Sequence, residues 1–172
     1  MQKAKQRSEI AQQDKWRIED IYATDEAWEA DYNECIRRAK EKCVYQGRLA
    51  ESAQILYQAL KESDEADLLV EHVYVYAFMK YYEDTANAVY QEMSGRAQAA
   101  VTKLSEKYAF LTPEILAIDQ KKMQEYLSSD TLALYRHALE DILAKKEHAL
   151  SEKEERLLAM AGQVTASPNE IF

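Results

Sequence analysis

Residues 63–84 read SDEADLLVEHVYVYAFMKYYED, and this stretch decides the fold class. Its only continuous polar stripe at helical spacing consists of His72, Tyr76, Lys80 and Glu83, while Leu, Val, Tyr, Phe and Met occupy most of the remaining circumference. A helix that is apolar on most sides belongs at the centre of a bundle. The run VYVY could instead form a buried strand, but the pattern persists for about twenty residues, which favours a helix.

Helical patterns are also expected on the N-terminal side of this stretch. Thr24 is a suitable N-cap for a helix over residues 24–43, and a second helix is expected over residues 52–62. Ser63 then suits the N-cap of the central helix. The helix over 24–43 must pack on another element, because apolar side chains gather on one of its faces. These side chains are Trp28, Tyr32, Cys35, Ile36 and Ala39.

A second long helix is expected directly after the central one. Its apolar residues alternate at steps of three and four, which is typical of a coiled-coil-like seam. The seam consists of Tyr90, Met93, Ala97, Val101, Leu104, Tyr108 and Leu111. The short link near Thr85 and Asn87 predicts a long antiparallel hairpin. Pro113 is expected to close this hairpin, because the residue before a proline resists helical geometry.

The rest of the chain predicts shorter helices. After a short turn at residues 113–118, helices are expected over residues 120–127 and 131–146. Another helix opens at Ser151, where Ser151 and Glu154 form a capping box. The sequence therefore predicts an all-α multi-helix bundle with a long antiparallel hairpin.

Composition agrees with an all-helical fold of one ordinary-sized domain. The 172 residues include only 3 Gly and 2 Pro, whereas average usage predicts roughly 12 and 9, so sheets joined by tight turns lack turn residues. The N-terminus has no apolar run behind its basic residues, so no signal peptide or membrane anchor is expected and a cytosolic location is the default. The net charge of −9, with both signs interleaved along the helices, argues against a nucleic-acid partner.

The residues alone predict no catalytic centre and no metal site, and they leave the substrate-binding residues unknown. His72, His137 and His148 lack the spacing of a zinc-protease helix and have no Glu three positions before them, so structural or solvent roles are expected. Cys35 and Cys43 lie about 12 Å apart if helical, which exceeds disulfide reach. The twelve tyrosines fit core packing better than a peptide-binding wall, which stays a second possibility.

Several separated segments resemble the amino-terminal region of oligoendopeptidase F, a zinc metallopeptidase family related to thimet oligopeptidase. They are KWRIEDIYATDEAWEADY (15–32), GRLAES (47–52), VYVYAFMKYYEDTANAVYQ (73–91), PEILAI (113–118), YRHALEDILAKKEHALSEKEERLLA (135–159) and SPNEIF (167–172). They follow the family's order over nearly the whole chain. Ala11 and Arg17 depart from the family pattern, but both are surface-type changes.

The resemblance implies that this chain is the N-terminal helical lobe of a larger peptidase. We expect residues 1–112 to hold the first helices and the hairpin, and residues 113–172 to lead toward a catalytic domain. The family's His-Glu-x-x-His motif and its third zinc ligand would lie beyond Phe172, so no catalytic or metal residue is carried over and this chain is expected to be inactive. Zinc, a zinc-activated water and an oligopeptide substrate belong to the parent enzyme.

Two further expectations follow from that resemblance. The lobe would cover one wall of a channel and restrict access to short peptides, and faces that pack on the missing domain could promote self-association. At the end of the chain, Ser167, Pro168 and Glu170 form a helix start, which fits a parent that continues. The alternative function is a stand-alone helical module that binds a peptide or protein without catalysis.

Overall fold

The computed structural model describes residues 9–145, and every regular element in that range is helical. The α-helices are α1 (Asp25–Lys40), α2 (Ala53–Glu83), α3 (Ala88–Tyr108), α4 (Leu111–Ala117), α5 (Gln120–Leu127) and α6 (Arg136–Ala144), and the 3-10 helices are η2 (Gln12–Asp14), η3 (Ile18–Asp20) and η4 (Asp130–Tyr135). The predicted all-α fold class is confirmed. The helix expected from Ser151, His148 and the helix start at Ser167 lie outside the described residues.

Helices α1 and α2 both begin where the sequence predicted a helix start, but α2 does not end near Glu62 as expected. Thr24 caps α1, its Oγ1 accepting a hydrogen bond from the Ala27 N–H at 3.3 Å. Helix α2 is one helix of 31 residues, capped by Ser52, rather than two separate helices. Ser63, the predicted cap, is 8% exposed in its interior. Residues 61–66 contain neither Gly nor Pro, and extending a helix is easier than nucleating a new one, so the helix continues through them.

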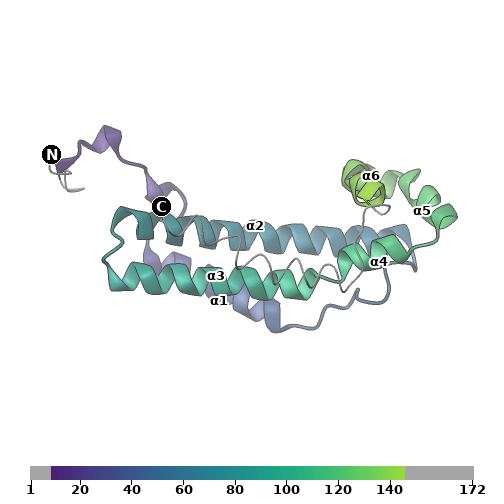
Figure 1. The fold of residues 1–172 in the computed structure, drawn as a ribbon, viewed down its shortest axis with the longest axis horizontal. Helices are drawn as coiled ribbons and strands as arrows, with labels where there is room; N and C mark the ends of the chain where they lie inside the picture. The colour runs from purple at the N-terminus through teal and green to yellow at the C-terminus, as the bar shows by residue number, and fades with distance from the viewer. Residues whose placement is uncertain (1–8, 146–172) are drawn as a thin grey trace.

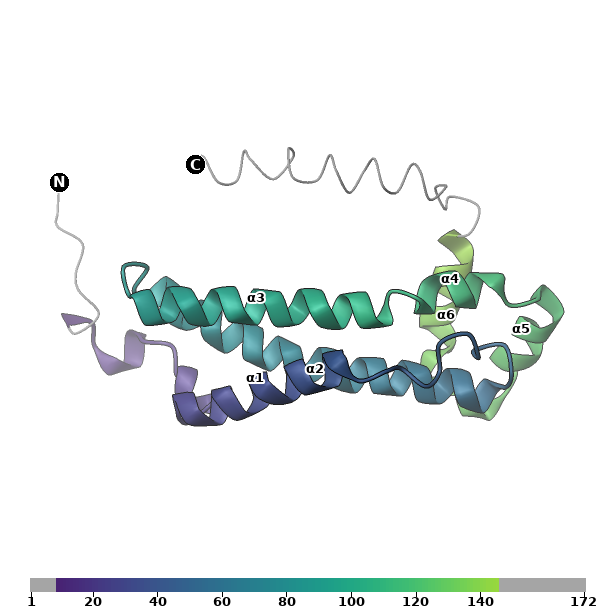
Figure 2. The same cartoon turned by 90° about the horizontal axis from the view of Figure 1, so that it is seen from below.

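Helices α1, α2 and α3 form the first of two hydrophobic cores. Helices α2 and α3 lie side by side and are joined by the turn at residues 84–87 (Figure 1). Helix α1 runs along one side of this pair (Figure 2). The Trp28 indole is fully buried between them, and its Nε1 donates a hydrogen bond to the Val73 carbonyl oxygen at 2.8 Å. The other buried members include Cys35, Ala66, Val70, Ala77, Met93, Ala97, Ala100 and Leu104.

The second core joins the N-terminal part of α2 to the helices that follow α3. Helices α4, α5 and α6 gather at one end of the α2–α3 pair (Figure 1). The buried residues of this second core include Leu49, Leu56, Ala59, Ile115, Ile118, Met123, Leu132 and Leu139. Because α2 contributes to both cores, this helix of 31 residues fixes the position of one core relative to the other.

Two predicted boundaries in this region are wrong. Pro113 lies in the first turn of α4, where its missing N–H would have no helical partner, and α3 has already ended at Tyr108. The helix expected over 131–146 is divided into η4 and α6. The 3-10 winding has about three residues per turn. It therefore directs both Leu132 and Tyr135, which lie three apart, into the second core.

The two cysteines are packing residues. Cys35 and Cys43 are both free and buried in the described structure. Burial raises the pKa of the Cys35 thiol to about 11, which keeps it protonated near neutral pH. Separately, no helix within residues 9–145 is both long enough and apolar enough to cross a membrane.

Candidate functional site

Among the described residues, the histidines and cysteines are not part of any group that could hold a metal ion. His72 is exposed on α2, and His137 on α6 faces solvent with its Nε2 3.7 Å from Asp141 Oδ2. Residues 9–145 contain no group of three or more His, Cys, Asp or Glu side chains that could hold a metal ion. This part of the chain therefore does not offer the ligand set that a catalytic zinc requires.

Two members of the polar stripe predicted on α2, Tyr76 and Lys80, form a hydrogen-bonding cluster with the start of α1. Tyr76 is buried, and its hydroxyl donates a hydrogen bond to Asp25 Oδ1 at 2.8 Å. The Lys80 ammonium pairs with the same carboxylate and lies 5.3 Å from the Tyr90 ring centroid. Partial burial acts to raise the pKa of Asp25, but the hydrogen bonds from Lys80 and Tyr76 outweigh it and lower that pKa. This cluster holds the start of α1 against α2.

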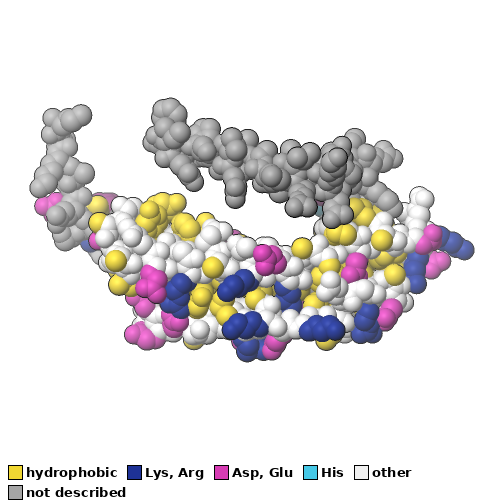
Figure 3. Space-filling model, turned by 60° about the horizontal axis from the view of Figure 1, so that its bottom comes forward, with side chains coloured by type: hydrophobic (Ala, Val, Ile, Leu, Met, Phe, Trp, Pro, Cys, Tyr) yellow, Lys and Arg dark blue, Asp and Glu magenta, His cyan; other side chains and the backbone are white. Residues whose placement is uncertain are grey.

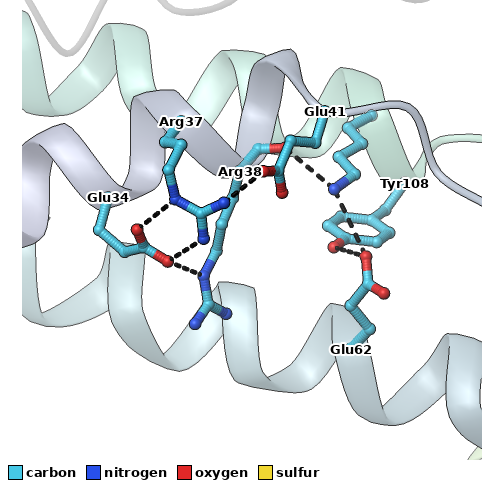
Figure 4. Close-up of polar contacts among 7 residues, drawn as sticks. Glu34, Arg37, Arg38, Glu41, Glu62 and Tyr108 are labelled. Atoms are coloured by element: carbon cyan, nitrogen blue, oxygen red, sulfur yellow. Dashed lines mark hydrogen bonds and ion pairs between the residues drawn. The ribbon is translucent and has the colours of Figure 1, made fainter.

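A second polar cluster ties the C-terminal end of α1 to α2 and α3 (Figure 4). The Lys107 Nζ donates to the Arg38 carbonyl oxygen at 2.9 Å and lies 3.4 Å from Glu62 Oε1. The Tyr108 hydroxyl donates to the same Glu62 oxygen at 2.9 Å. Burial and then this carboxylate raise the pKa of Tyr108.

A cavity of about 710 Å³ lies beside the Lys107 cluster, between the last turns of α1 and α3. Its lining includes four lysines, Lys40, Lys42, Lys103 and Lys107, and Lys and Arg side chains gather in the lower part of the space-filling view (Figure 3). The C-terminal ends of helices carry partial negative charge, which lysines stabilise. The lysines thus have a structural explanation, and the converging helix ends disfavour an anion in the cavity.

The remaining candidate is an aromatic surface on the C-terminal part of α2. The four side chains Tyr74, Phe78, Tyr81 and Tyr82 form a connected ring cluster that we call the aromatic face. The Phe78 centroid lies 4.2 Å from that of Tyr74 in a stacked arrangement, 6.3 Å from that of Tyr81 and 6.0 Å from that of Tyr82. None of the four is buried, and Tyr82 is 69% exposed. Exposed aromatic clusters of this kind mark interaction surfaces.

Two groups can be distinguished among the tyrosines, and the sequence did not separate them. The buried ones direct their hydroxyls to acceptors on other elements. Their pairs are Tyr22 with Asp31, Tyr76 with Asp25, Tyr108 with Glu62, Tyr126 with the Ala50 carbonyl and Tyr135 with Asp64. The tyrosines of the aromatic face instead contact other rings at the surface. The sequence does contain a signal for this group, because its four aromatic residues follow one another along α2 at steps of four, three and one.

Two hollows border the aromatic face. The first is a groove of about 300 Å³ between α2 and α3, lined by Val70, Glu71, Tyr74, Gln98 and Val101. The second measures about 360 Å³ and lies between η2 and the end of α2, with Trp16, Met79 and Tyr82 in its lining. Trp16 is 70% exposed there. The aromatic face is thus continuous with concave surface on both sides, which is suited to an elongated partner.

Comparison with solved structures first shows that this helical fold occurs in known proteins. A crystal structure of a putative peptidase from Chlamydophila abortus matches with a TM-score of 0.77 and 24% identity, over 96% of this chain and 28% of that chain. This match establishes the fold. A crystal structure of oligoendopeptidase-F from Enterococcus faecium matches with a TM-score of 0.71 and 29% identity, over 86% of this chain and 28% of that one.

Sequence comparison then shows which proteins this chain is similar to. The family model described as Oligopeptidase F matches residues 114–172. Oligopeptidase PepF of Bacillus subtilis (strain 168) is 40% identical over 96% of this chain and 25% of its own length, and an oligoendopeptidase F homolog of Lactococcus lactis subsp. lactis is 40% identical over 98% and 28%. This chain is related to the N-terminal region of oligoendopeptidase F. It spans about a quarter of the length of these curated relatives.

Proposed function

We propose that this chain is the N-terminal helical lobe of an oligoendopeptidase F-like zinc metalloendopeptidase that hydrolyses short peptides. The observation that carries the proposal is the asymmetry of coverage, because the Bacillus subtilis relative matches 96% of this chain with only 25% of its own length. The remaining part of such a polypeptide would supply zinc and the hydrolytic residues. The lobe would be inactive by itself, with the catalytic domain of the same polypeptide as its partner.

Within that enzyme, the lobe would form one wall of the substrate channel and limit access to short peptides. Residues 1–112 would contribute the α2–α3 pair, and residues 113–172 would lead toward the catalytic domain. Helix α2 supports this role, because it is anchored in two hydrophobic cores and presents an unburied aromatic face. A rigid element is better suited than a loop to define the width of a channel. A cytoplasmic location is part of the same proposal.

A chimeric enzyme tests this function. The matching quarter of the Bacillus subtilis relative is replaced by this chain, and cleavage of a quenched fluorescent peptide is measured with zinc added. We expect the chimera to cleave the peptide, and this chain alone to show no turnover. Metal bound stoichiometrically to this chain alone, together with peptide cleavage, would overturn the proposal. A folded chimera that hydrolyses no peptide would also contradict it.

The second candidate function is a stand-alone helical module that binds a peptide or a partner helix without catalysis. The exposure of Trp16, Leu68, Tyr82 and Val89 favours it, because a binding module presents apolar side chains to its ligand. Size-exclusion chromatography with an apolar-surface dye discriminates the two candidates. If the chain is a peptidase lobe, we expect self-association and dye binding that disappear in the chimera. If it is a binding module, we expect a monomer with saturable affinity for peptides.

A further inference from the structure

One side of α2 combines carboxylates with aromatic rings. Asp67, Glu71, Tyr74 and Phe78 follow one another at steps of four, three and four residues, so they share one side of the helix. We propose that this acidic and aromatic stripe binds a cationic peptide segment in which arginine or lysine alternates with apolar side chains. The proposal concerns binding by this chain itself, so it does not depend on the peptidase role.

The groove beside the stripe fits a single side chain of such a segment. Val70, Glu71 and Tyr74 of α2 and Gln98 and Val101 of α3 line its volume of about 300 Å³, which is at the lower end for ligand sites. Val70 and Val101 give the groove an apolar surface. Glu71 is the one ionisable carboxylate in that lining, and it supplies an acceptor at the edge. An apolar side chain and a neighbouring cation would therefore be accommodated together.

The carboxylates of the stripe have no cation beside them in the described structure. Within residues 9–145, neither Asp67 nor Glu71 has an ion-pair partner. Lys80 is the sole Lys or Arg between residues 62 and 95, and it is turned toward Asp25. Partial burial raises the pKa of Asp67, and its neighbours Asp64 and Glu71 raise it further. A bound cation would relieve this repulsion between like charges.

The rings offer a second contact for the same cation. Tyr74 and Phe78 stack with centroids 4.2 Å apart, and they lie one turn and two turns beyond Glu71. A guanidinium group stacks on aromatic faces and pairs with carboxylates, so arginine can use both parts of the stripe. The chain already contains such a contact, because the Arg96 guanidinium carbon lies 4.1 Å from the Tyr32 ring centroid. The same group pairs with the Glu29 carboxylate.

Charge also decides between this occupant and the other candidates. The carboxylates of the stripe would repel the phosphates of a nucleic acid. A second copy of this chain would carry the same net charge of −9, so repulsion between the copies disfavours it as the occupant. The net charge of −9 adds a general attraction for cations, so a test must separate the stripe from that background.

The experiment measures binding of a blocked, fluorescently labelled synthetic peptide in which arginine alternates with phenylalanine. Two companion peptides carry glutamate in place of arginine, or serine in place of phenylalanine. The variant Asp67→Asn/Glu71→Gln removes the stripe carboxylates. The control variant Glu140→Gln/Asp141→Asn makes the same chemical change on the exposed surface of α6. It therefore has the same net charge as the stripe variant. Far-ultraviolet circular dichroism checks that both variants fold.

We expect saturable binding of the arginine–phenylalanine peptide and much weaker binding of both companions. The stripe variant should weaken affinity roughly fivefold or more at low salt, because two exposed charge pairs are lost. The control variant should change it less than twofold. Equal weakening in the two variants would assign the binding to net charge and overturn the proposal. Absence of saturable binding to the unmodified chain, or equal binding of the serine peptide, would overturn it as well.

Discussion

The indole Nε1 of Trp28 in α1 donates a hydrogen bond to the backbone carbonyl oxygen of Val73 in α2 at 2.8 Å. Trp28 is 1% exposed, and its ring is stacked with that of Tyr32 at a centroid distance of 5.4 Å. This single side chain fills the centre of the first core and fixes where α1 lies along α2. This polar contact thus lies inside an apolar environment, where losing its donor has a high cost.

Replacing this tryptophan tests that dependence. Trp28→Phe removes the N–H donor and part of the ring volume, and we expect the free energy of unfolding to fall by about 2 kcal/mol. Urea denaturation followed by circular dichroism measures the change. Trp16→Phe is the matched control, and its effect should stay within about 0.5 kcal/mol because Trp16 is exposed. Equal effects of the two variants would contradict the assignment of Trp28 to the core.

The continuity of α2 gives a second matched pair. Ser52→Ala removes a cap whose Oγ accepts the Ile55 N–H at 3.2 Å, so we expect a loss of about 1 kcal/mol. Ser63→Ala lies inside the helix, where alanine has the higher helix propensity, and it should be neutral or slightly stabilising. Thermal unfolding of both variants measures the difference. A larger loss from Ser63→Ala would indicate two separate helices.

The contact between α3 and the end of α1 can be tested at Lys107. The Lys107 side chain is 8% exposed and bonds to the Arg38 carbonyl and Glu62 (Figure 4). Lys107→Met keeps the aliphatic stem and removes the charge, which leaves a partly buried carboxylate with fewer donors. We expect a loss of about 1 to 3 kcal/mol in urea unfolding. Lys103→Met is the control on an exposed position of α3, and a comparable loss there would refute the specific role of Lys107.

The decrease of the free energy of unfolding at acid pH should depend on Glu34. Hydrogen bonds from Arg37 and then Arg38 lower the pKa of Glu34 to about 2 (Figure 4). A carboxylate with a lowered pKa stabilises the folded state fully above its unfolded value of 4.5 and loses that contribution as pH falls toward 2. Solvent screening limits the effect to about 1 kcal/mol or less.

Unfolding free energies measured between pH 6 and about 2.5 check this prediction. Glu34→Gln should be less stable than the unmodified chain near neutral pH, and the two curves should converge at the acid end. Glu92→Gln changes an exposed residue of α3 and should run parallel to the unmodified curve. A constant difference between Glu34→Gln and the unmodified chain across this pH interval would exclude the pKa shift as its cause.

The sequence by itself determined the class of fold and the resemblance to oligoendopeptidase F. The scarcity of Gly and Pro leaves few residues able to end or reverse a helix, so long helical segments were predictable from composition and periodicity. The cap of α1 at Thr24 was predictable because an N-cap hydrogen bond joins residues three apart in the chain. The segments that resemble oligoendopeptidase F were readable for a similar reason, since each is a local run of residues.

Tertiary structure alone decided which polar and aromatic residues face inward. Tyr76 and Lys80 belong to a stripe that reads as polar, yet Asp25, some fifty residues earlier, accepts hydrogen bonds from both. Tyr74 and Phe78 read as core residues, yet both stay partly exposed, and Tyr74 lies at the groove between α2 and α3. A hydrophobic pattern specifies that a side chain can be buried, whereas the positions of the other helices determine whether it is. The candidate surface was hidden from the sequence for this reason.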